Sequence, residues 1–192
     1  MKRQMGWMLA LALPLAGLFW GGCRSTAIDP YMVLQIPADQ KLYTAYNIWY
    51  ERDVISSVNY QVGAILPFGS EVQIVRVTEK DLVFQPVGME RQFTLRYYQK
   101  YGVEPMEAFL KKTVTTADAT TQCLDIPEDT LQKMRTGIVA PGMTKAQVLK
   151  TCGYPPAHRT PSTDLDSWIY WRNRWATGRV FFKDGKVVET HY

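Results

Sequence analysis

The stretch GIVAPGMTKAQVLKTCGYPPAHRT (residues 137–160) decides the fold of the C-terminal part of the chain. Thr144 and Gln147 have the spacing of a capping box, in which each side chain accepts a hydrogen bond from a backbone N–H at the start of a helix. Gly153 is a typical residue for the end of a helix, and the two prolines that follow it forbid continuation. The stretch therefore predicts one short helix and then a Pro-rich loop.

The next stretch, DSWIYWRNRWATGRVFFKDGKVVETHY (166–192), predicts an antiparallel sheet of three strands. Its runs SWIYW and GRVFF are rich in aromatic and β-branched residues, and Asp184-Gly185 is typical of a two-residue hairpin turn. Upstream, Asp125 and Glu128 have capping-box spacing, which predicts another helix over 125–136. Residues 123–192 are therefore expected to form an α+β domain of two helices and a three-stranded antiparallel sheet.

Residues 40–116 predict a small β-rich domain that ends in a helix. The runs EVQIVRV, LVFQPV and QFTLRYY are separated by polar or Pro/Gly turns and indicate five or six short strands in a barrel or meander. The order of the apolar strand AIL, the turn Pro67-x-Gly69 and the strand with Val72-x-Ile74 weakly resembles that of bacterial SH3-like domains. A helix is expected over Glu104–Val114, with Pro105 in its first turn. The polar segment 115–122 is expected to link two halves that fold separately.

Residues 1–22 predict a signal peptide, because the charged Lys2 and Arg3 precede an apolar segment. The segment ends in Gly-Gly-Cys23, which is typical of a lipoprotein cleavage site, so Cys23 is the expected lipidated residue. The alternative is a plain signal peptide, with Cys23 an ordinary thiol. After Cys23, the segment up to residue 39 is expected to be a tether.

That tether (23–39) contains two prolines and no sustained hydrophobic period. The alternative within it is an edge strand over 32–36. Lipidation would make the anchor effectively permanent, because each buried methylene adds about 0.8 kcal/mol and such a cysteine carries several acyl chains.

Several motifs in the last third of the chain occur in a characteristic order: Gly142-Met143-Thr144-x-x-Gln147-Val148, Gly153-x-Pro155, Trp168-x-Tyr170, Val180-x-Phe182 and Asp184-Gly185-Lys186-Val187. In this order they resemble the SmpA/OmlA family of small lipoproteins of the bacterial outer membrane. The best understood member of that family is an accessory subunit of the machinery that inserts β-barrel proteins. The residue after the expected lipidation site is Arg24 and not aspartate. By resemblance to enterobacterial sorting rules, this implies the outer membrane and not the inner one.

The composition argues against nucleic acid as a partner. Without Lys2 and Arg3, 20 of the 22 basic residues remain against 18 acidic ones, so the exported chain is nearly neutral. No basic stripe is present along the sequence. We therefore expect the partners to be the membrane, through the lipid anchor, and a protein of the cell envelope.

The sequence does not predict an enzyme. Cys152 and His158 could pair across the Pro-rich turn, with Asp125 or Asp164 as a third member, but no feature near Cys152 would lower the pKa of its thiol. The two histidines and three cysteines lack the spacing of metal ligands, and there is no Gly-rich phosphate loop. We therefore expect no catalytic residue, no metal and no cofactor.

A disulfide is expected between Cys123 and Cys152. Export places the chain in an oxidising compartment, and the two cysteines flank two adjacent predicted helices at the same end of the pair. The bridge would also account for Cys152 standing where the SmpA/OmlA family has an aliphatic residue. The alternative is that Cys152 is a small buried apolar residue and Cys123 a free thiol.

Aromatic side chains crowd the predicted three-stranded sheet. Alternation places Trp168 and Tyr170 on one face, and Ile169 and Trp171 on the other. One face is expected to meet the helices, and the other either covers the N-terminal half or forms a binding surface. The residues expected to form an interaction surface are Trp168, Tyr170, Trp171, Arg172, Arg174 and Trp175.

These patterns together predict a non-enzymatic lipoprotein on the periplasmic face of the outer membrane. Its expected role is that of an interaction or scaffold module in the envelope, in outer-membrane assembly. The alternative is a periplasmic ligand-binding or inhibitor lipoprotein, which would use a groove between its two domains.

Overall fold

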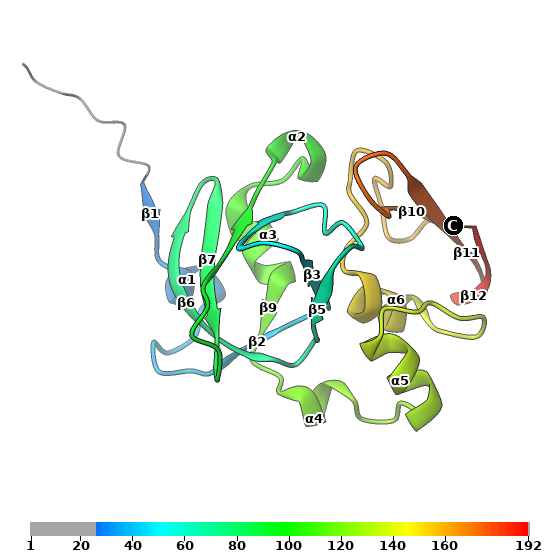
Figure 1. Ribbon diagram of the computed structural model, residues 1–192, viewed down its shortest axis with the longest axis horizontal. Coiled ribbons are helices and arrows are strands. Elements are labelled where there is room, and N and C mark those ends of the chain that lie inside the picture. Colours follow the sequence, from blue (N-terminus) through cyan, green and yellow to red (C-terminus); the bar gives the residue numbers. More distant parts are fainter. Residues whose placement is uncertain (1–25, 192) are drawn as a thin grey trace, which may run out of the picture.

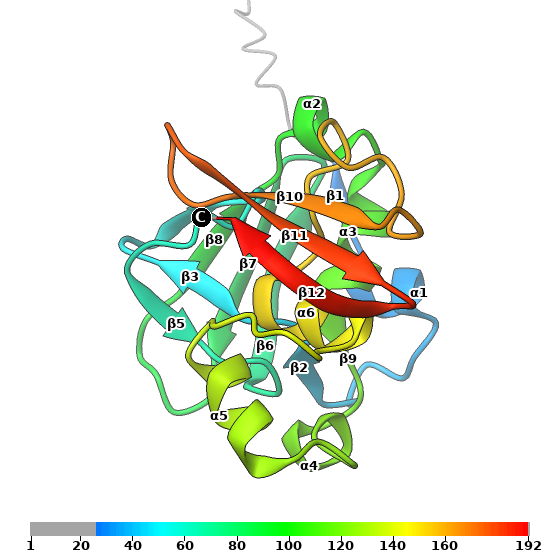
Figure 2. The same cartoon turned by 90° about the vertical axis from the view of Figure 1, so that its right-hand side faces the viewer.

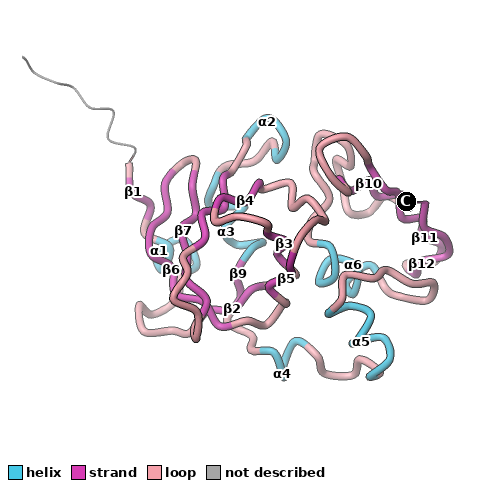
Figure 3. Tube along the Cα trace, in the orientation of Figure 1, coloured by secondary structure: helices cyan, strands magenta, loops and turns pink. Residues whose placement is uncertain are grey.

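The structure is a computed structural model, and it describes residues 26–191. Within these residues the protein is a mixed α+β fold with six helices and several sheets (Figure 1). The expected signal peptide and Cys23 lie outside the described residues. The described strands form a seven-stranded, a three-stranded and a two-stranded sheet, and Figure 3 shows how the strands and helices are arranged. We call residues 26–122 the N-terminal half and residues 123–191 the C-terminal half.

The N-terminal half is built on a seven-stranded curled sheet. The strand order is β4-β8-β7-β6-β2-β9, and β1 pairs with β6 beside β2. Neighbouring strands are antiparallel except β4 and β8, which are parallel. A separate two-stranded sheet joins β3 to β5. The strands are β1 (Ala27–Ile28), β2 (Leu42–Thr44), β3 (Ile48–Tyr50), β4 (Val54–Ser56), β5 (Ala64–Leu66), β6 (Glu71–Thr78), β7 (Asp81–Pro86), β8 (Phe93–Arg96) and β9 (Val114–Thr115).

The core of this half lies between the sheet and helix α3 (Met106–Thr113). Alternate residues of the central strands, such as Leu82 and Phe84 or Phe93 and Leu95, are buried there, as the period of two requires. A short helix, α2 (Gln99–Gly102), connects β8 to α3. The helix expected over Glu104–Val114 is confirmed with slightly shorter bounds.

The expected tether over 23–39 is wrong from Ala27 onward, where the chain already belongs to the fold. β1 pairs with the end of β6, and helix α1 (Pro30–Leu34) packs its apolar residues on the core. The alternative edge strand over 32–36 is wrong for the same reason. The helix starts there because Asp29 caps it and Pro30 occupies its first turn.

The expected linker over 115–122 is also ordered. Thr115 pairs with Tyr43 in the large sheet, and a one-turn helix, α4 (Ala119–Gln122), follows with Asp118 as its cap. The Gln122 side chain is buried and donates hydrogen bonds to the backbone carbonyls of Thr44 and Ala117. The segment is therefore attached to the N-terminal half.

The C-terminal half has the predicted two helices and three-stranded antiparallel sheet (Figure 2). The capping box of Thr144 and Gln147 is confirmed at the start of the second helix. The box expected between Asp125 and Glu128 is wrong, because the first helix begins only after Pro127 and has no side-chain cap. The elements are α5 (Glu128–Arg135), α6 (Lys145–Cys152), β10 (Ser167–Trp171), β11 (Thr177–Lys183) and β12 (Lys186–His191).

The two halves share a buried polar junction. The Asn47 side chain, from the loop before β3, donates to the backbone carbonyls of Met134 and Thr151 at 2.7 and 3.1 Å. Asn59 donates to the carbonyls of Asn47 and Cys152. Phe68, which belongs to the N-terminal half, packs into the hydrophobic core of the C-terminal half. Residues of both halves therefore contribute to the buried contacts between them.

Candidate functional site

A cavity of about 290 Å³ lies where the two halves meet, and we call it the junction cavity. Its walls come from the loop after β4, from α2 and α3, and from the Pro-rich loop after α6. Segments that lie far apart in the sequence therefore build one site. Its lining includes Tyr46, Ser57, Asn59, Tyr97, Tyr101, Glu104, Phe109, Lys112, Tyr154, Pro155, Pro156, Thr160 and Pro161.

Aromatic rings form the apolar walls of the junction cavity. Tyr46 and Tyr154 meet edge to face, with ring centroids 6.5 Å apart, and Tyr97 stacks obliquely on Phe109 at 4.7 Å. Tyr101, from α2, packs on the ring of His158 at 5.0 Å. These contacts fix the rings in place, so the walls are formed before any ligand arrives.

One ion pair supplies the charges of the junction cavity. Lys112 contacts Glu104 at 2.5 Å, and its ammonium group also lies 5.1 Å from the centre of the Tyr154 ring. The Tyr97 hydroxyl donates to the Glu104 backbone carbonyl. Since the two charges neutralise each other, the cavity suits a neutral group that can both donate and accept hydrogen bonds.

The buried Tyr46 hydroxyl is not an acid or a base at neutral pH. Burial raises the pKa of Tyr46 to about 12, and the hydroxyl is hydrogen-bonded to Thr113. It therefore stays neutral and serves as a fixed wall of the cavity.

The Cys152–His158 pairing considered from the sequence has no support in the structure. Burial raises the pKa of the Cys152 thiol to about 12, so the thiol is neutral and inert. His158 is exposed, and its ring contacts Tyr101 and Trp171. Residues 26–191 contain no group of three or more His, Cys, Asp or Glu side chains that could hold a metal ion.

The disulfide expected between Cys123 and Cys152 is absent, since both are free cysteines in the structure. Cys152 is part of the core of the C-terminal half, and Cys123 ends α4 and packs against that core from its edge. Cys152 is thus a small buried apolar residue, as in the alternative prediction, and its correspondence to an aliphatic residue of the SmpA/OmlA family stays a prediction.

The expected interaction surface is wrong for Trp168 and Tyr170. Both are buried on the sheet face that meets the helices, and Trp168 is 0% exposed. Their polar atoms are satisfied inside the protein: the Trp168 indole donates to the Leu165 carbonyl, and the Tyr170 hydroxyl donates to the Gly153 carbonyl. They are core residues.

The other four members of that surface divide into two pairs. Trp171 and Arg172 are half-buried and hold the junction, where Trp171 contacts Tyr60 and Arg172 donates to Gln61. Arg174 and Trp175 lie in the β10–β11 turn and are exposed, Trp175 by 93%. These two line a shallow groove of about 690 Å³ together with Trp49, Tyr50, Arg52, Val54, Tyr60 and Tyr98.

Sequence reasoning missed the junction cavity. Tyr46, Tyr154, Glu104 and Lys112 stand in four separate segments without a shared spacing, so no local pattern marks them. The available signal was two local clusters, YYQKY (97–101) and YPP (154–156), but no feature of the sequence relates one cluster to the other.

Comparison with known proteins yields no relative: no protein-family model, no curated protein and no solved structure matches the chain. Among the helices that the structure describes, none is long and apolar enough to span a bilayer.

Proposed function

We propose that this chain is a lipid-anchored envelope protein that acts by binding and has no catalytic step. The junction cavity is the observation that carries this proposal, because its walls are preformed by both halves and its polar groups form a neutral pair. The export signal and the Gly-Gly-Cys23 motif support the periplasmic face of the outer membrane as the location.

We also propose that the C-terminal half is SmpA/OmlA-like. The motifs that carry this resemblance lie at α6 and on the three strands β10, β11 and β12. They therefore belong to one helix and one sheet that follow each other in the chain. The likeness of the N-terminal half to SH3-like domains stays a proposal that rests on its strand and turn order. Both support a role in interaction or scaffolding within the envelope, in outer-membrane assembly.

The ligand we propose for the junction cavity is a short segment of an envelope protein. A volume of about 290 Å³ is at the low end of the roughly 300–1,000 Å³ of small-molecule sites, so it suits one or two side chains of a partner. Tyrosine and proline walls favour flat apolar groups, and Lys112 and Glu104 offer one donor and one acceptor to a peptide backbone.

Site-specific photocrosslinking tests this proposal in cells. A photoreactive phenylalanine analogue at Tyr154, on the cavity rim, should give an adduct with a discrete envelope protein. The same analogue at the exposed Val188 on β12 is the matched control. Equal adducts at both positions, or none at Tyr154, contradict a protein ligand; glycan attached at Tyr154 would instead favour the ligand-binding alternative.

The lipid anchor has a separate test. The measurement is detergent phase separation of membranes. The wild-type chain should enter the detergent phase, and the Cys23→Ser variant should not. Equal membrane partition of the two proteins would contradict lipidation at Cys23.

A further inference from the structure

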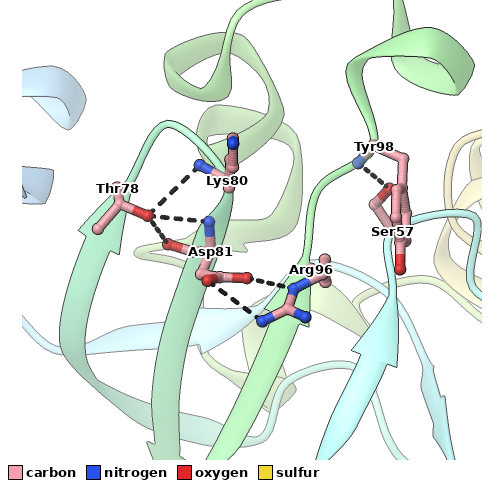
Figure 4. A network of polar contacts seen from close by, with 6 residues as sticks. All are labelled: Ser57, Thr78, Lys80, Asp81, Arg96 and Tyr98. Atoms are coloured by element: carbon pink, nitrogen blue, oxygen red, sulfur yellow. Dashed lines mark hydrogen bonds and ion pairs between the residues drawn. The ribbon is translucent and has the colours of Figure 1, made fainter. Parts of the chain in front are cut away.

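The N-terminal chain enters the fold at one defined end of the large sheet. The register pairs Ala27 with Thr78, Asp81 with Arg96, and Ser56 with Arg96, so these residues form one row across the sheet end. Figure 4 shows the row from Thr78 through Arg96 to Ser57 and Tyr98. Because β1 runs antiparallel to β6, its first residue, Ala27, lies at this end of the sheet.

Two further segments lie at the same end. Helix α2 follows β8, and Figures 1 and 2 place α2 at the end of the large sheet where β1 begins. The β10–β11 turn (172–176) lies beside the α2 region. The groove that Tyr98 and Trp175 line together shows that the two segments are neighbours. The end therefore consists of the β6–β7 turn (79–80), the α2 region (98–103) and the β10–β11 turn, and we call it the anchor end.

The exposed side chains of the anchor end are those found at the surface of a bilayer. Trp175 is 93% exposed, Val103 69% and Tyr98 39%, although all three are large and apolar or amphipathic. Tryptophan and tyrosine prefer the level of the lipid headgroups, where one part of the ring is apolar and another part is wet. Side chains of this kind therefore have a natural partner in lipid.

The charges of the anchor end suit an anionic surface. Lys80, Lys100 and Arg174 are exposed, and Glu79 is the one carboxylate in the three segments. Asp81, at the start of β7, is already paired with Arg96 at 2.9 Å. Each cation near an anionic leaflet adds roughly 1 kcal/mol of attraction.

The distance to the membrane is short if Cys23 carries lipid, and this step rests on the proposed function. Ala27 stands four positions after Cys23 in the sequence, with three residues between them. A fully extended chain of four residues spans at most ~14 Å. A connection of this length keeps the anchor end close to the headgroups. It is too short for the opposite face of the protein, where β12 lies in Figure 1, to contact the membrane instead.

We propose that the anchor end is a membrane-docking surface that rests on the lipid headgroups of the anchoring leaflet. Trp175, Tyr98 and Val103 enter the headgroup region, and Lys80, Lys100 and Arg174 contact the lipid phosphates. The protein is then held in one orientation, with the junction cavity at a fixed height above the bilayer.

Hydrogen exchange on a chemically anchored chain tests the docking without relying on lipidation in the cell. The chain from residue 23, with Cys123→Ser, is coupled through the Cys23 thiol to a maleimide lipid in vesicles of phosphatidylethanolamine and phosphatidylglycerol. Amides in 98–103 and 172–176 should exchange several-fold more slowly than in the uncoupled chain. Amides in 184–190 should be unchanged. Equal rates with and without coupling in all three segments would overturn the proposal.

Charge reversal distinguishes docking from mere proximity. Without coupling, the K80E/K100E variant should bind the same vesicles at least about thirtyfold more weakly than the wild-type chain, because two cations of roughly 1 kcal/mol each are lost. The matched variant K183E/K186E, which changes the two lysines beside the β11–β12 turn and outside the anchor end, should bind like wild type. Equal losses in both variants would show a nonspecific attraction and contradict a docking face. The outcome of the Cys23→Ser partition test does not enter either measurement, so failure of the anchor and failure of the docking face remain distinguishable.

Discussion

Asn47 is fully buried, and its side chain makes three hydrogen bonds that join both halves. Replacement by alanine would remove the partner of the Thr151 carbonyl and of the Phe68 N–H, and would leave the Met134 carbonyl with the Gly137 N–H alone. Since each buried unsatisfied group costs about 1–3 kcal/mol, we expect Asn47→Ala to lower the free energy of unfolding by about 3 kcal/mol or more. Urea denaturation measures this. The exposed Gln132→Ala is the control, and an equally small effect of both would contradict the role of Asn47.

Cys152 and Tyr46 predict a loss of stability at alkaline pH. Burial raises their pKa values from 9.0 and 10.0 to about 12 in the folded protein, so the unfolded chain releases these protons first. Their contribution is fully present below pH 9 and is lost as the pH rises from about 9 to 12, at up to about 1.4 kcal/mol per pH unit for each group. The Tm should fall over this range, and less steeply in Cys152→Ala. A parallel decline in both proteins would refute the contribution of Cys152.

Labelling of the thiols checks the same environment by another route. In the native chain with Cys23→Ser, a thiol reagent should modify the partly exposed Cys123 and leave Cys152 unmodified until the protein unfolds. Two thiols should be counted under denaturing, non-reducing conditions. A count of zero would restore the disulfide that the structure lacks.

At the scale of the element, the end of α6 is fixed by a close approach. Gly153 has φ +79°, and an added Cβ would lie 2.9 Å from the Tyr46 ring and 3.2 Å from the Asn59 amide. Gly153→Ala should therefore cost roughly 2 kcal/mol or more, because it adds a clash to the unfavourable φ. Gly142→Ala is the matched control, since Gly142 has φ +88° but no atom near its Cβ position. Equal costs in urea denaturation would mean that backbone strain alone acts at Gly153.

Elements with strong local signals could be predicted from the sequence. The capping box of α6, the Asp184-Gly185 turn and the three strands around it are each specified by adjacent residues. The short elements α1, α2 and α4 were missed because each has five residues or fewer and gains its stability from packing on the core. Alternation along the strands predicted which residues of the three-stranded sheet share a face. It could not predict which of the two faces is buried, because that depends on tertiary contacts.

The candidate site could not be predicted because its residues meet only in three dimensions. Trp168 and Tyr170 were expected at an interaction surface because they are aromatic. Aromatic side chains also favour the core, and both residues are buried against the helices. Trp175 lies in the turn between two strands and is exposed, and its part in an interaction surface stays a prediction. For the junction cavity, neither spacing nor composition relates Tyr46 to Tyr154.

At the scale of the whole molecule, the shared junction predicts one cooperative unfolding transition. The separate folding of two halves was expected from a polar linker, whereas the buried bonds of Asn47 and Asn59 couple them. Calorimetry and tryptophan fluorescence should give the same Tm. Fragments 26–116 and 117–191, made separately, should not unfold cooperatively. Two resolved transitions, or a cooperative isolated fragment, would contradict this coupling.

The buried junction also has a consequence for biosynthesis. The N-terminal half is synthesised first, but the carbonyls of Met134, Thr151 and Cys152, which accept hydrogen bonds from Asn47 and Asn59, are synthesised later. Until then, the side-chain amides of Asn47 and Asn59 lack these acceptors, so the N-terminal half cannot reach its final packing. In this state we expect it to be sensitive to proteases and to need a chaperone. A premature stop that removes only the last helix and sheet would therefore eliminate the whole protein from the cell.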